Sequence, residues 1–387
     1  MTGENIVCFA KDWDDDPTSN THVMRVLARR NRVLWLNSIG MRSPSANSTD
    51  VRRIARKIGE FRRGAEQILP NLWVATPLVL PLPHSPLAVR ANRSMLALTV
   101  GRFRRKICME SFQLWTFLPN TVSYVGHLGE SLLVYYCTDD WRHVPGMDGV
   151  RLAAQEAALS RRADIVFATS RSLVERQREV NGETHLASHG VDHVHFARAL
   201  DPGPIAPELQ HLPAPVIGVI GLIDERIDMR LVAMVAGRHP EWTIALIGRV
   251  TGSTREIEAL PNVRLIGRQP YERLPEFCRG LAVGLIPFRT NEFTRHINPV
   301  KLREYLGAGL PVVSTDLPEV RSYGALCRVA RDGNEFVAAI EAALREDGPA
   351  LRQARSDAVR AESWETSVAT LVDHVARLRS PARMSAC

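Results

Sequence analysis

One stretch decides the fold: residues 296–316 read HINPVKLREYLGAGLPVVSTD. Asn298 is a favoured helix N-cap, and Pro299 suits the first helical position, where its missing N–H costs nothing. A Gly-Leu-Pro turn then ends the helix and starts a strand of β-branched residues. The pattern therefore predicts a helix over 299–308 and a strand over 311–315.

Two charged side chains indicate what this helix could bind. Lys301 and Glu304 are three residues apart, so they share one face of the helix. A helix N-terminus beside a lysine suits a phosphate, and a carboxylate suits the hydroxyls of a sugar. The stretch predicts an anion-binding helix with a hydroxyl-binding carboxylate. The alternative is a surface helix whose Lys301 and Glu304 only face water.

The rest of the chain alternates between strand-like and helical runs, which favours parallel sheets with helices on both faces. A length of 387 residues suits two domains. Prolines gather between 201 and 215, a composition that stiffens a linker. We predict an α/β protein with one domain at 1–200, a linker at 201–214, a second domain at 215–362 and a C-terminal helix within 363–387. The expected strands are 6–10, 32–36, 72–75, 113–117, 132–137, 165–169 and 185–187, then 215–222, 243–247, 263–266, 282–287, 311–315 and 326–329.

The sequence around the helix resembles that of retaining glycosyltransferases of family 4, which have the GT-B fold of two Rossmann-like domains facing each other across a cleft. The resemblance is carried by Glu304 with the small residues and turn after it, by His189-Gly-Val-Asp192, where the family has Asn, and by Ser-Trp-Glu at 363–365. It implies that the first domain binds the acceptor, the second binds the nucleotide sugar, and the last helix crosses back to the first domain. The first domain resembles bacterial enzymes that build cell-surface polysaccharides of the teichuronic-acid type.

The resemblance also implies a donor site in the second domain. Glu304 matches the second glutamate of the family's E-x7-E pair, which holds the ribose hydroxyls, and His296 occupies the place of the first glutamate. Arg226 and Lys301 are the expected cations for the diphosphate, because Leu222 stands where the family usually has an arginine. The other donor-binding candidates are Asn298, Pro299, Val300, Gly221, Gly248, Arg268 and Gln269.

In the first domain, carboxylates follow two predicted strands. Asp139 and Asp140 come just after the strand at 132–137, and Asp139 is the candidate for a polar contact to a sugar, counted with Arg226 and Lys301 as catalytic. The first loop contains Asp14-Asp-Asp16, but three consecutive side chains do not converge easily on one ion, so we predict no metal site. The acceptor-side candidates are Asp12, Asn20 and His127.

The positive charge of the chain is concentrated in its first half. The net charge is +7, and residues 1–200 hold the whole surplus, with 26 Lys and Arg against 19 Asp and Glu. Much of it lies in a basic amphipathic helix predicted near 51–65, which can bind anionic lipid at a membrane surface. The alternative is a solvated arginine-rich face. No aromatic platform accompanies the basic runs, so nucleic acid is not an expected partner.

Composition narrows the class of protein further. Hydrophobic residues make up 45% and charged residues 24%, as in globular proteins. No apolar run has the length of a membrane span and no signal peptide is visible, so we expect a cytoplasmic protein. The basic helix could place it at the inner face of the plasma membrane. The six cysteines form no Cys-x-x-Cys pair, which argues against a zinc site or a disulfide framework.

Together with the resemblance, these observations favour a transfer of a hexosyl unit from a nucleotide diphosphate sugar to a cell-surface glycan or lipid-linked acceptor. Retention of configuration is implied by the resemblance. No further cofactor is expected, because the nucleotide sugar is a substrate. Two alternatives stay open: a non-catalytic GT-B subunit that binds nucleotide or a partner enzyme, and a GT-B nucleotide-sugar epimerase. A dehydrogenase is disfavoured because no Gly-x-Gly-x-x-Gly follows the first strand of either domain.

Overall fold

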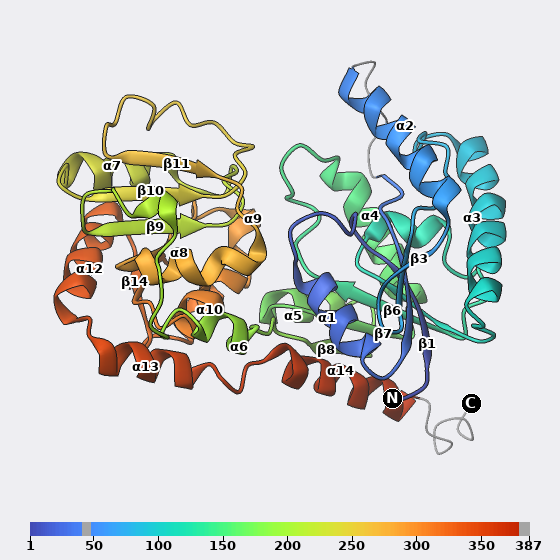
Figure 1. Cartoon of the computed structure of the whole chain (residues 1–387). Helices are drawn as coiled ribbons and strands as arrows, with labels where there is room; N and C mark the ends of the chain where they lie inside the picture. Colours follow the sequence, from blue (N-terminus) through green and yellow to red (C-terminus); the bar gives the residue numbers. More distant parts are fainter. Residues whose placement is uncertain (41–47, 379–387) are drawn as a thin grey trace. The chain divides into compact units, whose positions relative to one another are not determined.

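The computed structural model describes residues 1–40 and 48–378, which form two compact α/β units (Figure 1). The first unit consists of Met1–Ser188 together with the segment from Val368 on, and the second is His189–Ser367. Each unit has its own sheet and its own hydrophobic core. The predicted α/β class is confirmed in both halves.

The first unit is built on an eight-stranded sheet in the order β3-β4-β2-β1-β5-β6-β7-β8. All neighbours pair in parallel except β3 and β4. The edge strand β3 was not predicted, because all of its residues are exposed and it carries no apolar alternation. The strands are β1 (Asn5–Phe9), β2 (Arg32–Leu36), β3 (Glu66–Leu69), β4 (Leu72–Ala75), β5 (Gln113–Thr116), β6 (Leu132–Cys137), β7 (Ile165–Ala168) and β8 (Thr184–Leu186).

Helices lie between these strands, as a parallel sheet requires. A core of buried aromatic and aliphatic side chains joins the helices to the sheet, with Phe9, Phe103 and Phe112 among its large members. The helices are α1 (Ser19–Ala28), α2 (Ser48–Arg63), α3 (Pro86–Lys106), the short 3₁₀ helix η1 (Pro119–Ser123), α4 (Gly149–Arg162) and α5 (Arg171–Arg178). The basic helix predicted near 51–65 is α2.

The second unit is built on a six-stranded parallel sheet in the order β11-β10-β9-β12-β13-β14. Its strands are β9 (Val216–Ile220), β10 (Thr243–Ile247), β11 (Val263–Gly267), β12 (Val283–Ile286), β13 (Val312–Thr315) and β14 (Cys327–Ala330). One face packs on α7 (Met229–Arg238) and α12 (Gly333–Glu346). The other face packs on α6 (His193–Ala197), α8 (Leu274–Gly280) and α10 (Val300–Gly307). The unit also contains the short helices η3 (Tyr271–Arg273), α9 (Glu292–Arg295) and α11 (Pro318–Arg321).

Strand order reverses once in each sheet, between β1 and β5 and between β9 and β12. In open parallel sheets, ligands bind outside the carboxyl ends of the strands at such a switch point, because the loops on its two sides diverge there. The loop after β9 and the segment between β12 and α10 therefore flank the position where a ligand of the second unit is expected.

The second unit begins earlier than the sequence indicated. We predicted a boundary at 200 and a linker at 201–214, but residues from His189 on belong to the second unit. Phe196, Ala206 and Leu209 are buried in its core, and the proline-rich segment forms the short helix η2 (Pro207–Leu209). Prolines stop regular structure, but they do not prevent the apolar residues between them from packing.

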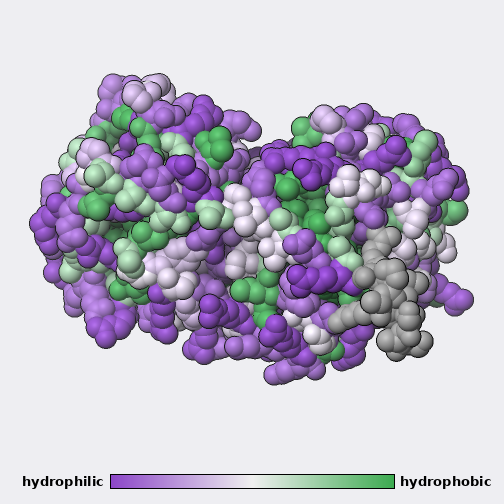
Figure 2. All heavy atoms as spheres, turned by 90° about the horizontal axis from the view of Figure 1, so that it is seen from below, coloured by the Kyte–Doolittle hydropathy of each residue, from purple (hydrophilic) through white to green (hydrophobic). Residues whose placement is uncertain are grey.

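Two helices follow the second sheet, α13 (Pro349–Ala358) and α14 (Trp364–Leu378). Helix α14 begins in the second unit and belongs to the first from Val368 on, where His374 stacks on His185 with ring centroids 3.9 Å apart. On the face shown in Figure 2, hydrophilic side chains predominate and hydrophobic ones form small groups among them. Across residues 1–40 and 48–378, no helix combines the length and hydrophobicity that crossing a membrane requires.

Candidate functional site

Two glycines meet at the carboxyl ends of β9 and β10. Gly221 and Gly248 have φ values of +139° and +156°, which L side chains rarely adopt. A Cβ at Gly248 would lie 1.7 Å from the carbonyl oxygen of Gly221, and a Cβ at Gly221 would lie 3.2 Å from Cε of Lys301. The absence of both side chains therefore lets the two backbones touch and brings Lys301 over them, beside the switch point.

Helix α10 confirms the predicted element with a different cap. Its N-cap is Pro299, so the helix begins at Val300 and no side-chain oxygen of the N-cap residue binds its first N–H groups. Asn298 was predicted as the cap; it is instead buried, and its Oδ1 accepts a hydrogen bond from Nη1 of Arg303 at 2.7 Å. The positive end of the helix is thereby kept for another partner, as an anion site requires.

Arg303 anchors the start of this helix from behind. It is only 4% exposed, its Nε donates to Glu362 Oε2 at 2.7 Å, and its guanidinium lies 5.2 Å from the ring centre of Tyr323. Tyr323 donates its hydroxyl to the same carboxylate. The sequence analysis did not single out Arg303, because its partners are distant in sequence.

Lys301 and Glu304 share one face of α10, as predicted, and form an ion pair. Glu304 is 6% exposed, whereas the Lys301 side chain is 28% exposed. Below them lies the buried Cys278, whose thiol pKa is raised to about 12 by burial and by the charge of Glu304. A carboxylate and a cation thus lie together at the carboxyl end of β9, with the cation more accessible.

Tyr305 ties α10 to the sheet. Strand β12 pairs with β9 only at Val283 and Gly284, and beyond this pairing the N–H of Ile220 donates to Oη of Tyr305 at 2.7 Å. The Tyr305 ring lies directly against Gly284, where a Cβ would be 2.7 Å from it. The hydroxyl therefore satisfies the backbone where the two strands separate, and this fixes the distance between α10 and the loop after β9.

In the loop after β9, Arg226 forms an ion pair with Asp224. Nε and Nη2 of Arg226 bind the carboxylate of Asp224 at 2.8–3.0 Å. Asp228, further along the loop, is the N-cap of α7. The guanidinium lies 5.8 Å from the ring centre of Phe288, just past β12, so Arg226 faces the switch point with its charge partly offset by Asp224.

Arg289 is a cation that the sequence analysis missed. Its backbone N–H donates to the carbonyl of Arg226 at 2.7 Å, and its exposed side chain reaches the carbonyl of Ile227 at 3.3 Å. It follows β12 at the carboxyl end of the strand. Its position after a predicted strand was the only sign in the sequence that Arg289 could belong to the site. Arginines are too common in this chain for such a position to single one out.

The remaining donor candidates lie on two segments. Arg268 is exposed just after β11, and Gln269 accepts from Nη1 of Arg273 at 2.9 Å. Tyr271 stacks on His195, with centroids 4.6 Å apart, and so packs within the protein. His296 is half-buried at the end of α9, ahead of Val300 at the start of α10. The structure brings Gly221, Gly248, Lys301 and Glu304 together.

His189, where the resembled family has Asn, is buried in the second unit. Burial and the charge of Arg303 lower the pKa of His189 to about 3. Its ring lies 6.2 Å from that of Trp364, and the neighbouring Val191 pairs with Ser363. The imidazole is therefore neutral in the folded chain over the physiological pH range.

We expect His189 to make the protein acid-sensitive. An unfolded histidine has a pKa of about 6.5, so between about pH 6.5 and 3 the unfolded chain binds a proton that the folded chain does not. As the pH is lowered through this window, the free energy of unfolding should decrease by up to about 1.4 kcal/mol per pH unit. Urea unfolding at pH 7 and 4.5 should show a smaller loss in His189→Asn. The exposed His127→Asn serves as control, and equal losses in all three proteins would contradict the idea.

In the first unit, Asp140 is buried after β6, whereas Asp139, the candidate for a sugar contact, is half-buried. Asp140 binds Arg142 and His143 at 3.0 Å and Arg176 at 2.7 Å. Burial opposes its charge, but hydrogen bonds from Arg142 and the charge of Arg176 hold the Asp140 pKa below its ordinary value. A choice between adjacent aspartates could not be made without knowing which side chain meets these cations.

Arg176 extends this cluster inward to Glu156. Its Nη2 donates to Glu156 Oε2 at 2.9 Å, and the hydroxyl of Tyr135 donates to Oε1 at 2.8 Å. Burial raises the pKa of Glu156, although the charge of Arg176 works against this shift. The cluster stabilises the loop after β6; the sequence analysis missed it because its members come from α4, α5 and β6.

The acceptor-side candidates have structural partners or lie elsewhere. Asp12 accepts from Ser38 N at 3.0 Å and forms ion pairs with Arg56 and Lys57 of α2, which joins the first loop to that helix. Asn20 is buried in the first turn of α1. His127 is exposed in the turn that leads into the amino end of β6. Among the described residues, no three His, Cys, Asp or Glu side chains are grouped as metal ligands would be.

Comparison with known proteins identifies a domain of the chain and its fold. Residues 214–346 match the family described as glycosyl transferases group 1. A curated relative is TuaH of Bacillus subtilis strain 168, whose name assigns it to teichuronic acid biosynthesis as a glycosyltransferase; it is 26% identical over 272 residues, which are 65% of this chain and 68% of TuaH.

Solved structures with the same fold cover nearly the whole chain. Sucrose-phosphate synthase of Thermosynechococcus elongatus gives a TM-score of 0.71 at 16% identity, over 97% of this chain and 99% of that one. HepE of Anabaena in complex with UDP and glucose gives 0.67 at 12% identity, over 97% and 100%. The chain thus carries a glycosyl transferases group 1 domain at residues 214–346 and has the GT-B fold.

Proposed function

We propose that this protein is a retaining, metal-independent hexosyltransferase that takes its sugar from a nucleotide diphosphate sugar and adds it to a cell-surface glycan or lipid-linked acceptor. The observation that carries the proposal is the group formed by Gly221, Gly248, Lys301 and Glu304 at the switch point of the second sheet. It combines a cation, a nearly buried carboxylate and a close backbone approach, which suit a diphosphate and a ribose in adjacent positions.

The chemistry follows from these groups. Glu304 accepts hydrogen bonds from the ribose hydroxyls, and Lys301 exchanges its contact with Glu304 for one with the diphosphate. Charge develops on the diphosphate as the glycosidic bond breaks, and Lys301, Arg226, Arg289 and the N-terminus of α10 offset it. Positioned cations and helix dipoles can supply this stabilisation, which is why the proposal needs no metal ion.

The substrate class rests on the similar proteins. The HepE structures contain UDP with glucose or UDP-glucose, and a structure of the E. coli trehalose-6-phosphate protein contains UDP-2-fluoro glucose. We therefore put UDP-hexoses first among the donors. A cell-surface acceptor follows from the name of TuaH, and retention follows from the resemblance of α10 and its surroundings to the retaining family.

Calorimetric titration with UDP, GDP, ADP and TDP tests the donor site, and product analysis tests the reaction. We expect selective binding of one diphosphate, followed by transfer from the matching sugar with the anomeric configuration preserved in NMR spectra. Binding without any transfer or hydrolysis, also in the presence of membranes, would favour a non-catalytic subunit. A changed donor sugar in the absence of acceptor would indicate an epimerase.

We also propose that the protein works in the cytoplasm at the inner face of the plasma membrane, which it contacts through α2. Arg52, Arg62 and Arg63 are exposed on this helix, and Ile58 is 39% exposed, whereas Lys57 is held by Asp12. Exposed arginines beside an apolar side chain suit an anionic lipid surface. Sedimentation with vesicles should show binding to phosphatidylglycerol that Arg62→Glu with Arg63→Glu abolishes. Equal binding of this variant would refute the role of α2.

A further inference from the structure

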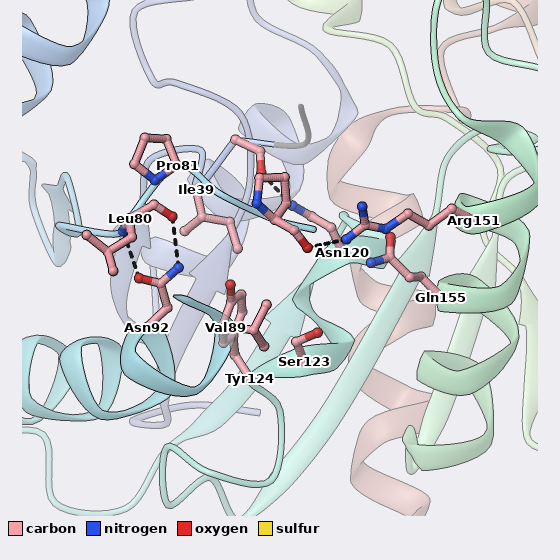
Figure 3. Close-up of a pocket in the computed structure, with 12 residues that line it drawn as sticks. Ile39, Leu80, Pro81, Val89, Asn92, Asn120, Ser123, Tyr124, Arg151 and Gln155 are labelled. Atoms are coloured by element: carbon pink, nitrogen blue, oxygen red, sulfur yellow. Dashed lines mark hydrogen bonds between the residues drawn. The ribbon is translucent and has the colours of Figure 1, made fainter. Parts of the chain in front are cut away.

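The first unit contains a pocket that none of the predicted site residues lines (Figure 3). Its volume is about 370 Å³ when the space that is open to solvent is included. Its walls come from the segments that follow β2, β4 and β5 and from the helices α3 and α4. The pocket therefore lies at the carboxyl ends of the strands, where open α/β sheets bind their ligands.

Much of the pocket wall is apolar. Ile39 and Leu80 come from the segments after β2 and β4, Pro81 lies beside Leu80, and Val89 and Tyr124 complete this wall. Tyr124 is buried, whereas Leu80 is 43% exposed at the rim. Such a wall suits the C–H faces of a sugar ring, which pack on aliphatic and aromatic side chains while the hydroxyls point to polar groups.

Asn120 contributes a hydrogen-bond acceptor to the pocket, and no described residue satisfies it. The residue is 8% exposed, and its Nδ2 donates to the carbonyl oxygen of Gly40 at 2.9 Å. Only the amide nitrogen can donate to a carbonyl, so this bond fixes the orientation of the side chain. Its Oδ1 is buried and finds no hydrogen-bond partner within the described part of the chain. A buried carbonyl left in this state is unfavourable, and a ligand hydroxyl would satisfy it.

The other polar groups in the wall give the pocket a neutral character. Ser123 and Gln155 are half-buried and add a hydroxyl and an amide. The guanidinium of Arg151 is engaged by the carbonyl of Pro83 and by His84. The side chain of Asn92 both accepts from and donates to the backbone of Leu80, at 2.7 and 3.0 Å. The chemistry offered to a ligand is thus a carbonyl, a hydroxyl and an amide.

We propose that this pocket binds one neutral pyranose ring of the acceptor glycan, with a ring hydroxyl donating to Asn120 Oδ1. The inference rests on the proposed function, since it names the class of acceptor. A phosphate is disfavoured because the cation in the wall is already engaged, and a hydrocarbon chain is disfavoured because it would leave the Asn120 carbonyl unsatisfied.

Saturation-transfer NMR with methyl glycosides tests the proposal on the full chain. The probes are methyl α- and β-glucopyranoside, the corresponding galactosides and methyl glucuronoside. We expect millimolar binding of at least one neutral glycoside, stronger than that of the charged glucuronoside, with the largest effects on ring C–H protons. Asn120→Leu should abolish the signal, and Gln155→Leu should reduce it at least about threefold. Gln67→Leu, an exposed position on β3, is the matched control.

Three results would overturn the proposal. The first is that no neutral glycoside gives a saturation-transfer signal, and the second is a signal that survives both Asn120→Leu and Gln155→Leu. The third is a hexyl glycoside, used as an additional probe, in which only the alkyl-chain protons receive saturation. If Asn120→Leu does not fold, the Gln155→Leu and Ser123→Ala variants decide. UDP titration of the same samples separates this site from the donor site. Glycoside binding that persists in Glu304→Ala while UDP binding is lost supports two independent sites; glycoside binding without any nucleotide binding would refute only the proposed donor site.

Discussion

Replacing Lys301 by methionine should raise the Kd for the preferred nucleoside diphosphate about 10- to 100-fold, because a charge-assisted contact contributes about 1.5–3 kcal/mol. Methionine keeps the length and the packing of the side chain over Gly221 and removes only the charge. The measurement is calorimetric titration at low and at moderate ionic strength. We expect the salt dependence of binding to shrink in Lys301→Met, because the lost contact is with a phosphate.

Glu304→Gln provides the comparison that assigns the two roles. It should also weaken binding, but its salt dependence should stay that of the unchanged protein, because its partner is a neutral hydroxyl pair. The two residues form an ion pair, so the effects of the single variants are not expected to add in the double variant. Lys106→Met, on the exposed end of α3, controls for loss of a lysine. A Kd of Lys301→Met within about twofold of the original would rule out the phosphate contact.

Replacing Gly248 by alanine should destabilise the second unit by about 2–4 kcal/mol and abolish nucleotide binding. The new Cβ would lie 1.7 Å from the Gly221 carbonyl oxygen, so one backbone has to move, and φ of +156° is strained for alanine. Either movement displaces the loop over which Lys301 lies.

Urea unfolding and UDP titration check this expectation together. Gly237→Ala is the matched control, since Gly237 lies exposed in α7 and no atom stands within 4 Å of an added Cβ. That control should leave stability unchanged or raise it slightly, because alanine favours a helix over glycine. Full stability and unchanged UDP binding in Gly248→Ala would show that the contact between the two loops is dispensable.

Most strands could be predicted because their signal is local. The strands β2, β4, β6 and β10 begin and end at the predicted residues, since each consists mainly of β-branched, aliphatic or aromatic side chains between polar turns. The exposed strand β3 was not predicted, because it is defined by its pairing with β4 and not by side-chain burial. The segment 201–214 was assigned to a linker because proline content says nothing about which apolar neighbours become buried.

The donor site could be predicted in part for the same reason. Lys301 and Glu304 are neighbours on one helix, so their joint position follows from helical geometry. The partner of Arg226 and the burial of Asp140 and not Asp139 depend on side chains brought in from other positions. The local sequence pattern could limit the partner of Arg226 and the buried aspartate to a few candidate residues, but it could not choose among those candidates.

The sequence by itself determined the two α/β halves, the boundaries of α10 to within a residue and the charged pair on its face, because these depend on periodicity and capping over a few consecutive residues. Only the tertiary structure decided that Gly248 touches Gly221, that Arg303 binds Asn298 instead of leaving it to cap the helix, and that the buried Asn120 carbonyl finds no partner among the described residues. Gly248 and Gly221 follow different strands, and Arg303 is held by Glu362, which is distant in sequence. The formation of such contacts depends on how the sheets order their strands, which no local pattern encodes.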